Sequence, residues 1–121
     1  MFLVTANKSA SLVRVDYIGR VTPAELASGL ADFRTLLAEM PRGFQLLVDL
    51  STLETMEVDC AAGIGQVMDL LDQSGVGRIV RVIPDADRDI GFNILGLFHY
   101  PHRPQTITCN NLLEACQRLT V

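Results

Sequence analysis

Short apolar runs alternate with stretches of helical periodicity along the chain. Residues 44–50 (FQLLVDL) form an almost continuous apolar run, as in strands that helices cover on one or both faces. Residues 78–83 (RIVRVI) are the next strand-like run. Shorter strand-like runs occupy residues 2–5, 12–18 and 106–109. The expected order is strand, strand, helix, strand, helix, strand, helix, strand, helix.

This order predicts an α/β fold, with a single-layer, mixed but mostly parallel sheet of about five strands and four helices. A helix between neighbouring strands permits the crossover that parallel pairing requires, and the first two strands form a hairpin at the mixed edge. No repeat, linker or low-complexity tract is visible. We therefore expect residues 1–121 to form a single domain.

Two of the predicted helices have clear N-terminal signals. Thr22 is followed by Pro23 and, three residues after the cap, by Glu25, which is the arrangement of a capping box. Asn111 is the expected cap of the last helix.

The charge balance excludes some functional classes. Ten basic and fourteen acidic residues give a net charge of −4, and the basic residues are scattered, whereas nucleic-acid binding normally needs a basic stripe. The longest uncharged stretch, residues 90–100, is too short to cross a bilayer, and the first seven residues do not resemble a signal peptide. We expect a cytoplasmic protein with no nucleic-acid partner and no membrane span.

The sequence contains no metal-binding pattern and implies no cofactor. The cysteines are odd in number and lack a ligand spacing, so we expect reduced thiols at Cys60, Cys109 and Cys116. His99 and His102 are separated by a helix-ending proline, and a solvated turn is the better interpretation. Asp69 and Asp72 are expected to face water on the polar side of the second helix.

The start of the second helix is the first candidate site. Residues 51–58 are expected to form a polar loop, and Asp59 is expected to cap a helix that continues through Gly63. The free N–H groups of residues 60–62 would then form an electropositive concavity at the carboxyl end of a central strand. The favoured interpretation of this concavity is an ordinary capped helix that binds nothing; the alternative is a site for a phosphate or a partner's carboxylate.

Cys60 has a chemical interpretation of its own. A thiol at a helix N-terminus has a lowered pKa and can act as a nucleophile or redox sensor. The adjacent Asp59 acts in the opposite direction and raises that pKa. A small, half-buried packing residue is therefore the favoured interpretation.

The third helix, around residues 90–98, is apolar nearly all round, although a helix on one face of a sheet needs only one apolar stripe. The excess predicts one of three things: burial against the sheet and neighbouring helices, a surface for a second subunit or another protein, or the wall of a cavity for an apolar ligand. The candidate interface residues are Ile90, Ile94, Leu97 and Phe98.

Several short motifs accompany the order of elements. They are Val48-Asp49-Leu50-Ser51-x-Leu53, Asp59-x-x-x-Gly63-Ile64-Gly65 and the closing Thr106-x-Thr108. With the element order, they resemble the STAS domain of the bacterial anti-sigma factor antagonists over nearly the whole chain. Through residues 19–22 and its apolar third helix, the chain resembles the SpoIIAA-like domains about equally well.

This resemblance implies a protein partner such as a kinase-like anti-sigma factor. In the antagonist family, the partner kinase phosphorylates a serine at the start of the second helix and thereby switches binding off. Asp59 and Gly63 match the acidic and glycine positions of that motif, but residues 60–62 hold no hydroxyl and the segment is one residue longer. Candidate substitutes upstream are Ser51, Thr52 and Thr55.

We therefore expect a non-catalytic regulatory or binding module that recognises a protein partner or a second copy of itself. Its expected recognition residues are Ser51, Thr52, Thr55, Asp59, Cys60 and Gly63. One alternative is a SpoIIAA-like carrier of a small apolar or lipid-like ligand beside the third helix. A less favoured one is a thiol enzyme or redox sensor that uses Cys60.

Overall fold

A computed structural model describes residues 1–83 and 86–119, with the backbone alone for residues 86, 87, 89 and 90. The elements of this part of the chain are, in order, β1 (Phe2–Asn7), β2 (Leu12–Tyr17), β3 (Gly19–Val21), α1 (Pro23–Ala38), β4 (Gln45–Asp49), β5 (Leu53–Met56), α2 (Cys60–Gln73), β6 (Arg78–Val82), α3 (Ala86–His99), β7 (Gln105–Cys109) and α4 (Leu112–Arg118). Among these, no helix has both the length and the apolar character needed to span a membrane.

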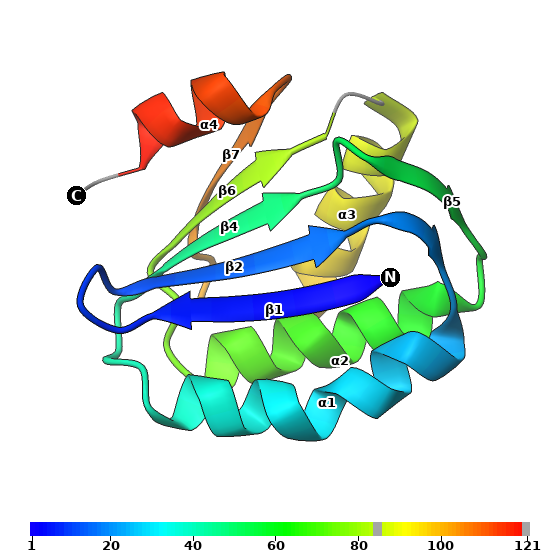
Figure 1. Cartoon of the computed structure of the whole chain (residues 1–121). Helices are drawn as coiled ribbons and strands as arrows, with labels where there is room; N and C mark the ends of the chain where they lie inside the picture. The colour runs from blue at the N-terminus through cyan, green and yellow to red at the C-terminus, as the bar shows by residue number, and fades with distance from the viewer. Residues whose placement is uncertain (84–85, 120–121) are drawn as a thin grey trace.

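The main sheet has five strands in the order β1-β2-β4-β6-β7 (Figure 1). β1 and β2 are antiparallel and every other neighbouring pair is parallel. The predicted α/β class is confirmed, as are the N-terminal hairpin at one edge and the mostly parallel five-stranded sheet.

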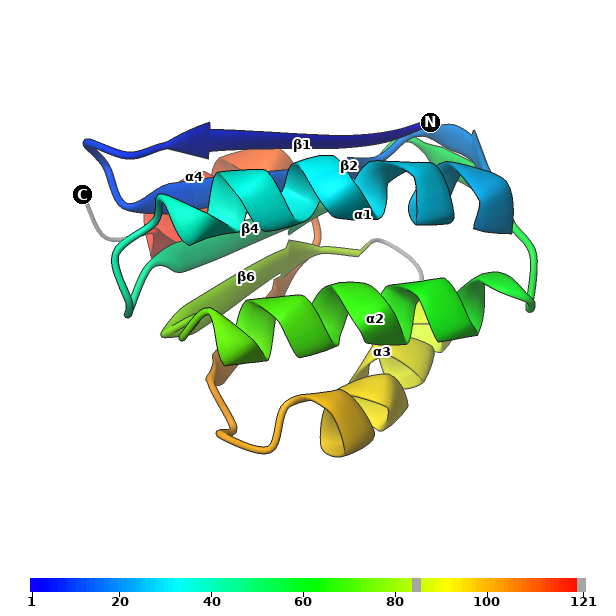
Figure 2. The same cartoon turned by 90° about the horizontal axis from the view of Figure 1, so that it is seen from below.

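Three helices cover one face of this sheet and the fourth covers the other. Figure 2 shows α1 and α2 side by side, with α3 next to α2. Apolar side chains from these helices pack with strand residues in one large core, for example Phe33 of α1, Leu71 of α2 and Phe92 of α3. On the opposite face, Ala115 of α4 packs with Val80 and Val82 of β6.

The prediction that residues 51–58 form only a polar loop is wrong. Within this segment lies β5, which pairs in parallel with β3 to form a separate two-stranded sheet. Leu53 is buried in the large core, whereas Glu54 and Thr55 are exposed. Four residues are too few for the alternation to stand out in the sequence, and the pairing partner lies more than thirty residues earlier. The small sheet leads the chain from the end of β4 to the start of α2.

Both helix caps with a hydroxyl or amide side chain are confirmed. Thr22 Oγ1 accepts a hydrogen bond from the backbone N–H of Glu25 at 3.3 Å, and Asn111 Oδ1 accepts one from the N–H of Glu114 at 2.8 Å. These bonds satisfy N–H groups that the first helical turn leaves without a helical partner.

Candidate functional site

The prediction that the Asp59 side chain caps the second helix is wrong. Asp59 has helical backbone angles, φ −62° and ψ −15°, and its side chain makes no capping hydrogen bond. The turn begins earlier, because the N–H groups of Cys60 and Ala61 already donate to the carbonyl oxygens of Glu57 and Val58, at 2.9 and 3.0 Å. Two of the three N–H groups expected to bind an anion are therefore occupied by the protein's own backbone.

Cys60 does not have the environment of a reactive thiol. Its side chain is fully buried, and Sγ donates to the carbonyl oxygen of Val21 at 3.5 Å. Burial raises the pKa of the thiol, and the nearby carboxylates of Glu57 and Asp59 act in the same direction. Because the thiolate is the nucleophile, this placement argues against a thiol enzyme or redox sensor. The packing interpretation is the one that fits.

The glycines that follow Asp59 allow α2 to pack closely against its two neighbours. A Cβ atom on Gly63 would lie 2.9 Å from Leu26 Cδ1 of α1, and one on Gly65 would lie 2.5 Å from His99 Nε2 of α3. Real Cβ atoms essentially never show distances this short, so a side chain at either position would displace the Leu26 or His99 side chain. The Gly63-Ile64-Gly65 motif is therefore a packing feature of the three-helix layer, and Gly63 faces inward.

The other predicted recognition residues lie on the surface. Ser51, Thr52, Thr55 and Asp59 are all exposed. Ser51 follows the end of β4, where its N–H donates to Asp49 Oδ1 at 2.9 Å. The three hydroxyl side chains are accessible, but they lie outside the groove that the neighbouring residues form.

That groove lies between the start of α2 and α3, with a volume of about 260 Å³. Its lining residues are Met56, Glu57, Val58, Ala61, Ile64, Arg88, Gly91, Phe92 and Leu95. Val58 is 91% exposed, an unusual position for a valine. At the groove's other side, Arg88 of α3 donates to the carbonyl oxygens of Leu53 and Glu54, at 3.2 and 3.0 Å. The groove lies between the two elements that the sequence singled out, but its described lining includes none of the site residues predicted from the sequence.

The helix α3 is buried on one side only, and its outer side exposes large apolar side chains. Ile94, Leu97 and Phe98 are 52%, 78% and 78% exposed, while Phe92 faces the core and is only 5% exposed. The side chain of Ile90 lies outside the described residues. Ile94 follows Gly91 by three residues, and Phe98 follows Leu95 by three residues, so each lies on the same side of α3 as a groove residue. The groove therefore continues into an apolar strip formed by Ile94 and Phe98.

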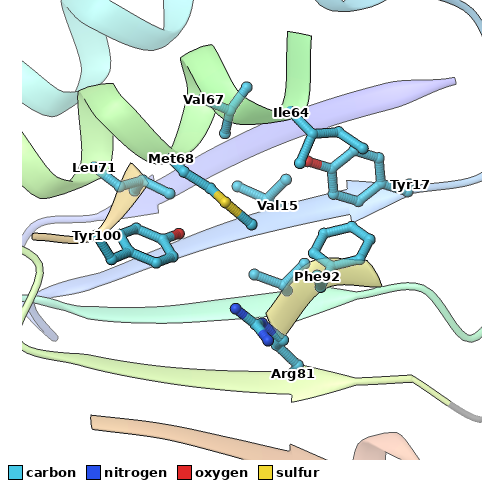
Figure 3. A pocket seen from close by; sticks show the side chains of 10 residues that line it. Val15, Tyr17, Ile64, Val67, Met68, Leu71, Arg81, Phe92 and Tyr100 are labelled. Carbon is cyan, nitrogen blue, oxygen red and sulfur yellow. The ribbon is translucent and has the colours of Figure 1, made fainter. Parts of the chain in front are cut away.

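The inner side of α3 leaves very little space. Figure 3 shows the side chains there, among them Tyr17, Met68, Arg81, Phe92 and Tyr100. They enclose a void of about 10 Å³, which is room for roughly one water molecule. A lipid-like ligand does not fit on this side of α3 in the observed arrangement.

Two histidines and a buried arginine have roles that the sequence did not suggest. Nδ1 of His99 lies 2.7 Å from Asp69 Oδ1, and Nδ1 of His102 lies 2.7 Å from Asp72 Oδ2. The expectation that both aspartates face water is wrong for Asp72, which is 6% exposed. Arg81 is buried to 2% exposure on β6. The two histidine–aspartate contacts join residues 30 positions apart, so no local spacing indicates them.

Within the described residues, no three histidine, cysteine or carboxylate side chains gather as a metal site. No family model matches the chain, and no curated protein matches it either.

Two solved structures are similar to the whole chain. One is an uncharacterized protein of the DUF3478 family with a SpoIIAA-like fold from Shewanella loihica PV-4, at a TM-score of 0.72 and 11% identity, covering 99% of this chain and 93% of that one. Another is the anti-sigma factor antagonist SpoIIAA in its unphosphorylated form, at a TM-score of 0.63 and 15% identity, covering 98% of this chain and 96% of that one. The chain therefore has the SpoIIAA-like fold that its resemblance to STAS domains predicted.

Proposed function

We propose that this chain is a non-catalytic regulatory module that binds a protein partner in the groove between the start of α2 and α3. The observation that carries the proposal is the groove itself, which is bordered by the exposed Val58 and continues into the strip of Ile94 and Phe98. A contiguous apolar surface of this kind is characteristic of an interaction site. The likeness to an anti-sigma factor antagonist supports a regulatory role.

The proposed class of partner is a kinase-like anti-sigma factor in the cytoplasm. Ser51, Thr52 and Thr55 are exposed in the segment that precedes the groove residues Met56, Glu57 and Val58, where a kinase can reach them. In the sequence, Thr55 lies between Glu54 and Glu57, so a phosphate on Thr55 would add to the negative charge of this segment. The added charge would repel an acidic partner and would oppose burial against an apolar one. Phosphorylation in this segment would therefore weaken an acidic or apolar partner's binding, even without the serine that the antagonist family uses.

The alternatives have less support. A carrier that encloses an apolar ligand beneath α3 needs a cavity of about 300–1,000 Å³, whereas the void there is about 10 Å³. A thiol enzyme needs an accessible thiolate, whereas Cys60 is fully buried.

Site-specific photocrosslinking tests the proposal. A benzophenone side chain replaces Val58 in the groove, Phe98 on the strip or, as a matched control, Leu113, which is 73% exposed on α4 at the opposite face of the sheet. In cells of the source organism, we expect Val58 and Phe98 to capture the same protein and Leu113 to capture none of it. Equal capture from all three positions, or none from Val58, would contradict the proposal.

A groove-blocking variant provides an independent control. Among the described residues beyond its own helix backbone, no atom lies within 4 Å of a Cβ placed on Gly91, so we expect Gly91→Glu to be accommodated without a clash while it places a charge in the groove. We expect this variant to keep its thermal unfolding temperature and to lose the crosslink from Phe98. Mass spectrometry of the chain isolated from cells then tests whether Ser51, Thr52 or Thr55 carries a phosphate.

A further inference from the structure

The first strand, β1, forms an open edge of the main sheet. It is the end strand of the order β1-β2-β4-β6-β7, with β2 as its neighbour. Figure 2 shows β1 at the margin of the molecule, farther out than α1, and none of the described elements lies beyond it. An edge strand of this kind presents backbone N–H and C=O groups to which another strand can bind.

The hydrogen bonds to β2 determine which backbone groups face outward. Met1 and Ile18 exchange hydrogen bonds, at 2.6 and 2.8 Å between their backbone nitrogens and oxygens. In an antiparallel ladder, such pairs alternate with pairs whose N–H and C=O groups point away from each other. Counting along the register from this pair, the outward groups are those of Phe2, Val4 and Ala6.

The edge formed by β1 lacks the features that usually protect an edge strand. Natural edges carry charged side chains or proline, contain a bulge, or are covered by another element. The six residues of β1 include no charged residue and no proline, and their register with β2 has no bulge. The other edge strand, β7, is one residue shorter and begins directly after Pro104. β1 is therefore the edge better suited to accept a further strand.

Charged groups of opposite sign lie near the two ends of this edge. A surface depression of about 530 Å³ between β1 and the first half of α1 is lined by Met1, Phe2, Ala24, Glu25, Ser28, Gly29 and Asp32. Glu25 Oε2 lies 3.1 Å from the Met1 ammonium group. Asp32 is exposed and forms no ion pair within the described part of the chain. The depression therefore retains negative charge beside the start of β1.

Lys8, the only lysine of the chain, directly follows the other end of β1. Its side chain is exposed and, among the described residues, has no ion-pair partner. Because side chains alternate along a strand, continuing the strand by one residue places Lys8 on the same side as Phe2. In an antiparallel pair of two such edges, this lysine comes close to the acidic depression of the other copy.

We propose that two copies of this chain associate by antiparallel pairing of their β1 edges, which joins the two sheets across a two-fold axis. In the register that the charges favour, Phe2 lies opposite Lys8 of the second copy and Val4 lies opposite Ala6. Each outward pair exchanges both of its backbone hydrogen bonds. Each Lys8 then lies beside Asp32 of the other copy, and the symmetry makes this contact twice.

Disulfide formation tests the register. In the proposed pairing, Thr5 lies opposite Thr5 of the second copy in a pair without hydrogen bonds, where Cα atoms are about 4.5 Å apart. That separation is within the range of about 4.4–6.8 Å that a disulfide spans. In a Cys116→Ser background, we expect Thr5→Cys to form a covalent dimer on mild oxidation. Leu3→Cys, and Thr106→Cys as the matched control on β7, should stay monomeric.

Sedimentation equilibrium tests the contribution of the backbone groups. We expect the wild type to dimerise with a Kd below about 1 mM. Ala6→Pro removes an outward N–H and leaves the hydrogen bonds to β2 in place, a position at which edge strands tolerate proline. This variant should keep its thermal unfolding temperature and be monomeric. Phe98→Ser, which changes the exposed strip on α3, should leave Kd unchanged.

Charge reversal provides a second variant at the same edge. Lys8→Glu places a like charge beside Asp32 in both symmetric contacts, and we expect Kd to rise by about tenfold. Adding Asp32→Lys to that variant restores opposite charges and should return Kd to near the wild-type value. Both positions are exposed, so neither change disturbs the core.

Three results would overturn the proposal. The first is a monomeric wild type at about 1 mM. The second is a dimer that persists in Ala6→Pro or Lys8→Glu and is lost in Phe98→Ser, which would place self-association on α3. The third is a higher yield of covalent dimer from Leu3→Cys than from Thr5→Cys. The edge shares no residue with the groove between α2 and α3, so these outcomes are distinct from a failure of the crosslinking experiment at Val58.

Discussion

At the scale of single residues, burial determines which thiols can react. Burial raises the pKa values of Cys60 and Cys109, while Cys116 is exposed on α4. We expect one fast-reacting thiol per native chain with Ellman's reagent near pH 8, and three after unfolding in guanidinium chloride, because the sequence holds three cysteines. A Cys116→Ser variant should show no fast-reacting thiol. Fast labelling of that variant would mean that Cys60 or Cys109 is reactive in the folded protein.

Single residues also show where sequence interpretation succeeds. Thr22 and Asn111 act as caps because the signal and the N–H group that it satisfies are only three residues apart. Asp59 is also of a residue type that favours the N-cap position, but here the helical turn begins before it, at Glu57 and Val58. The sequence does not indicate that earlier turn. Arg81 is buried on β6, and its partner Asn93 lies on α3, so no local sequence pattern indicates this contact.

At the scale of elements, two histidine–aspartate pairs connect the end of α3 and the following loop to α2. Asp72 is the more important partner because its side chain is 6% exposed, against 45% for Asp69, and it also accepts from the backbone N–H of His102 at 3.3 Å. We expect Asp72→Ala to lower the free energy of unfolding by about 1–3 kcal/mol. The matched variant Asp69→Ala should cost about 0–1 kcal/mol. Urea unfolding followed by circular dichroism measures both, and equal losses would contradict this assignment.

The elements themselves differ in how far the sequence predicts them. The strands β4 and β6 are rich in Leu, Val and Ile, so their class and neighbours follow from local pattern and order. β5 is four residues long and pairs with another short strand, so tertiary pairing creates it. For α3 the apolar excess was visible, yet composition alone cannot separate the buried Phe92 from the exposed Phe98. That separation required the position of the helix on the sheet.

At the scale of the whole molecule, the large core contains groups that resist ionisation. Burial raises the pKa values of Tyr17 and Tyr100, as it does for the thiols of Cys60 and Cys109. A raised pKa in the folded state means that folding favours the protonated form. The stabilising contribution is complete below the unfolded pKa values, which are about 8.5 for thiols and about 10 for phenols, and it is lost as pH rises through the folded values.

The free energy of unfolding should therefore begin to fall above about pH 8.5, where the thiols of the unfolded chain ionise, and fall more steeply above about pH 10, with each group contributing up to about 1.4 kcal/mol per pH unit. Tyr17→Phe isolates one contribution, because it keeps the ring that lies 5.3 Å from Phe2 and 6.0 Å from Phe92 and removes only the hydroxyl. Above about pH 10, urea unfolding should show a shallower decline for this variant than for the wild type, while Cys116→Ser should follow the wild type. Parallel curves for Tyr17→Phe and the wild type would mean that the loss of stability comes from the growing net negative charge instead of from ionisation in the core.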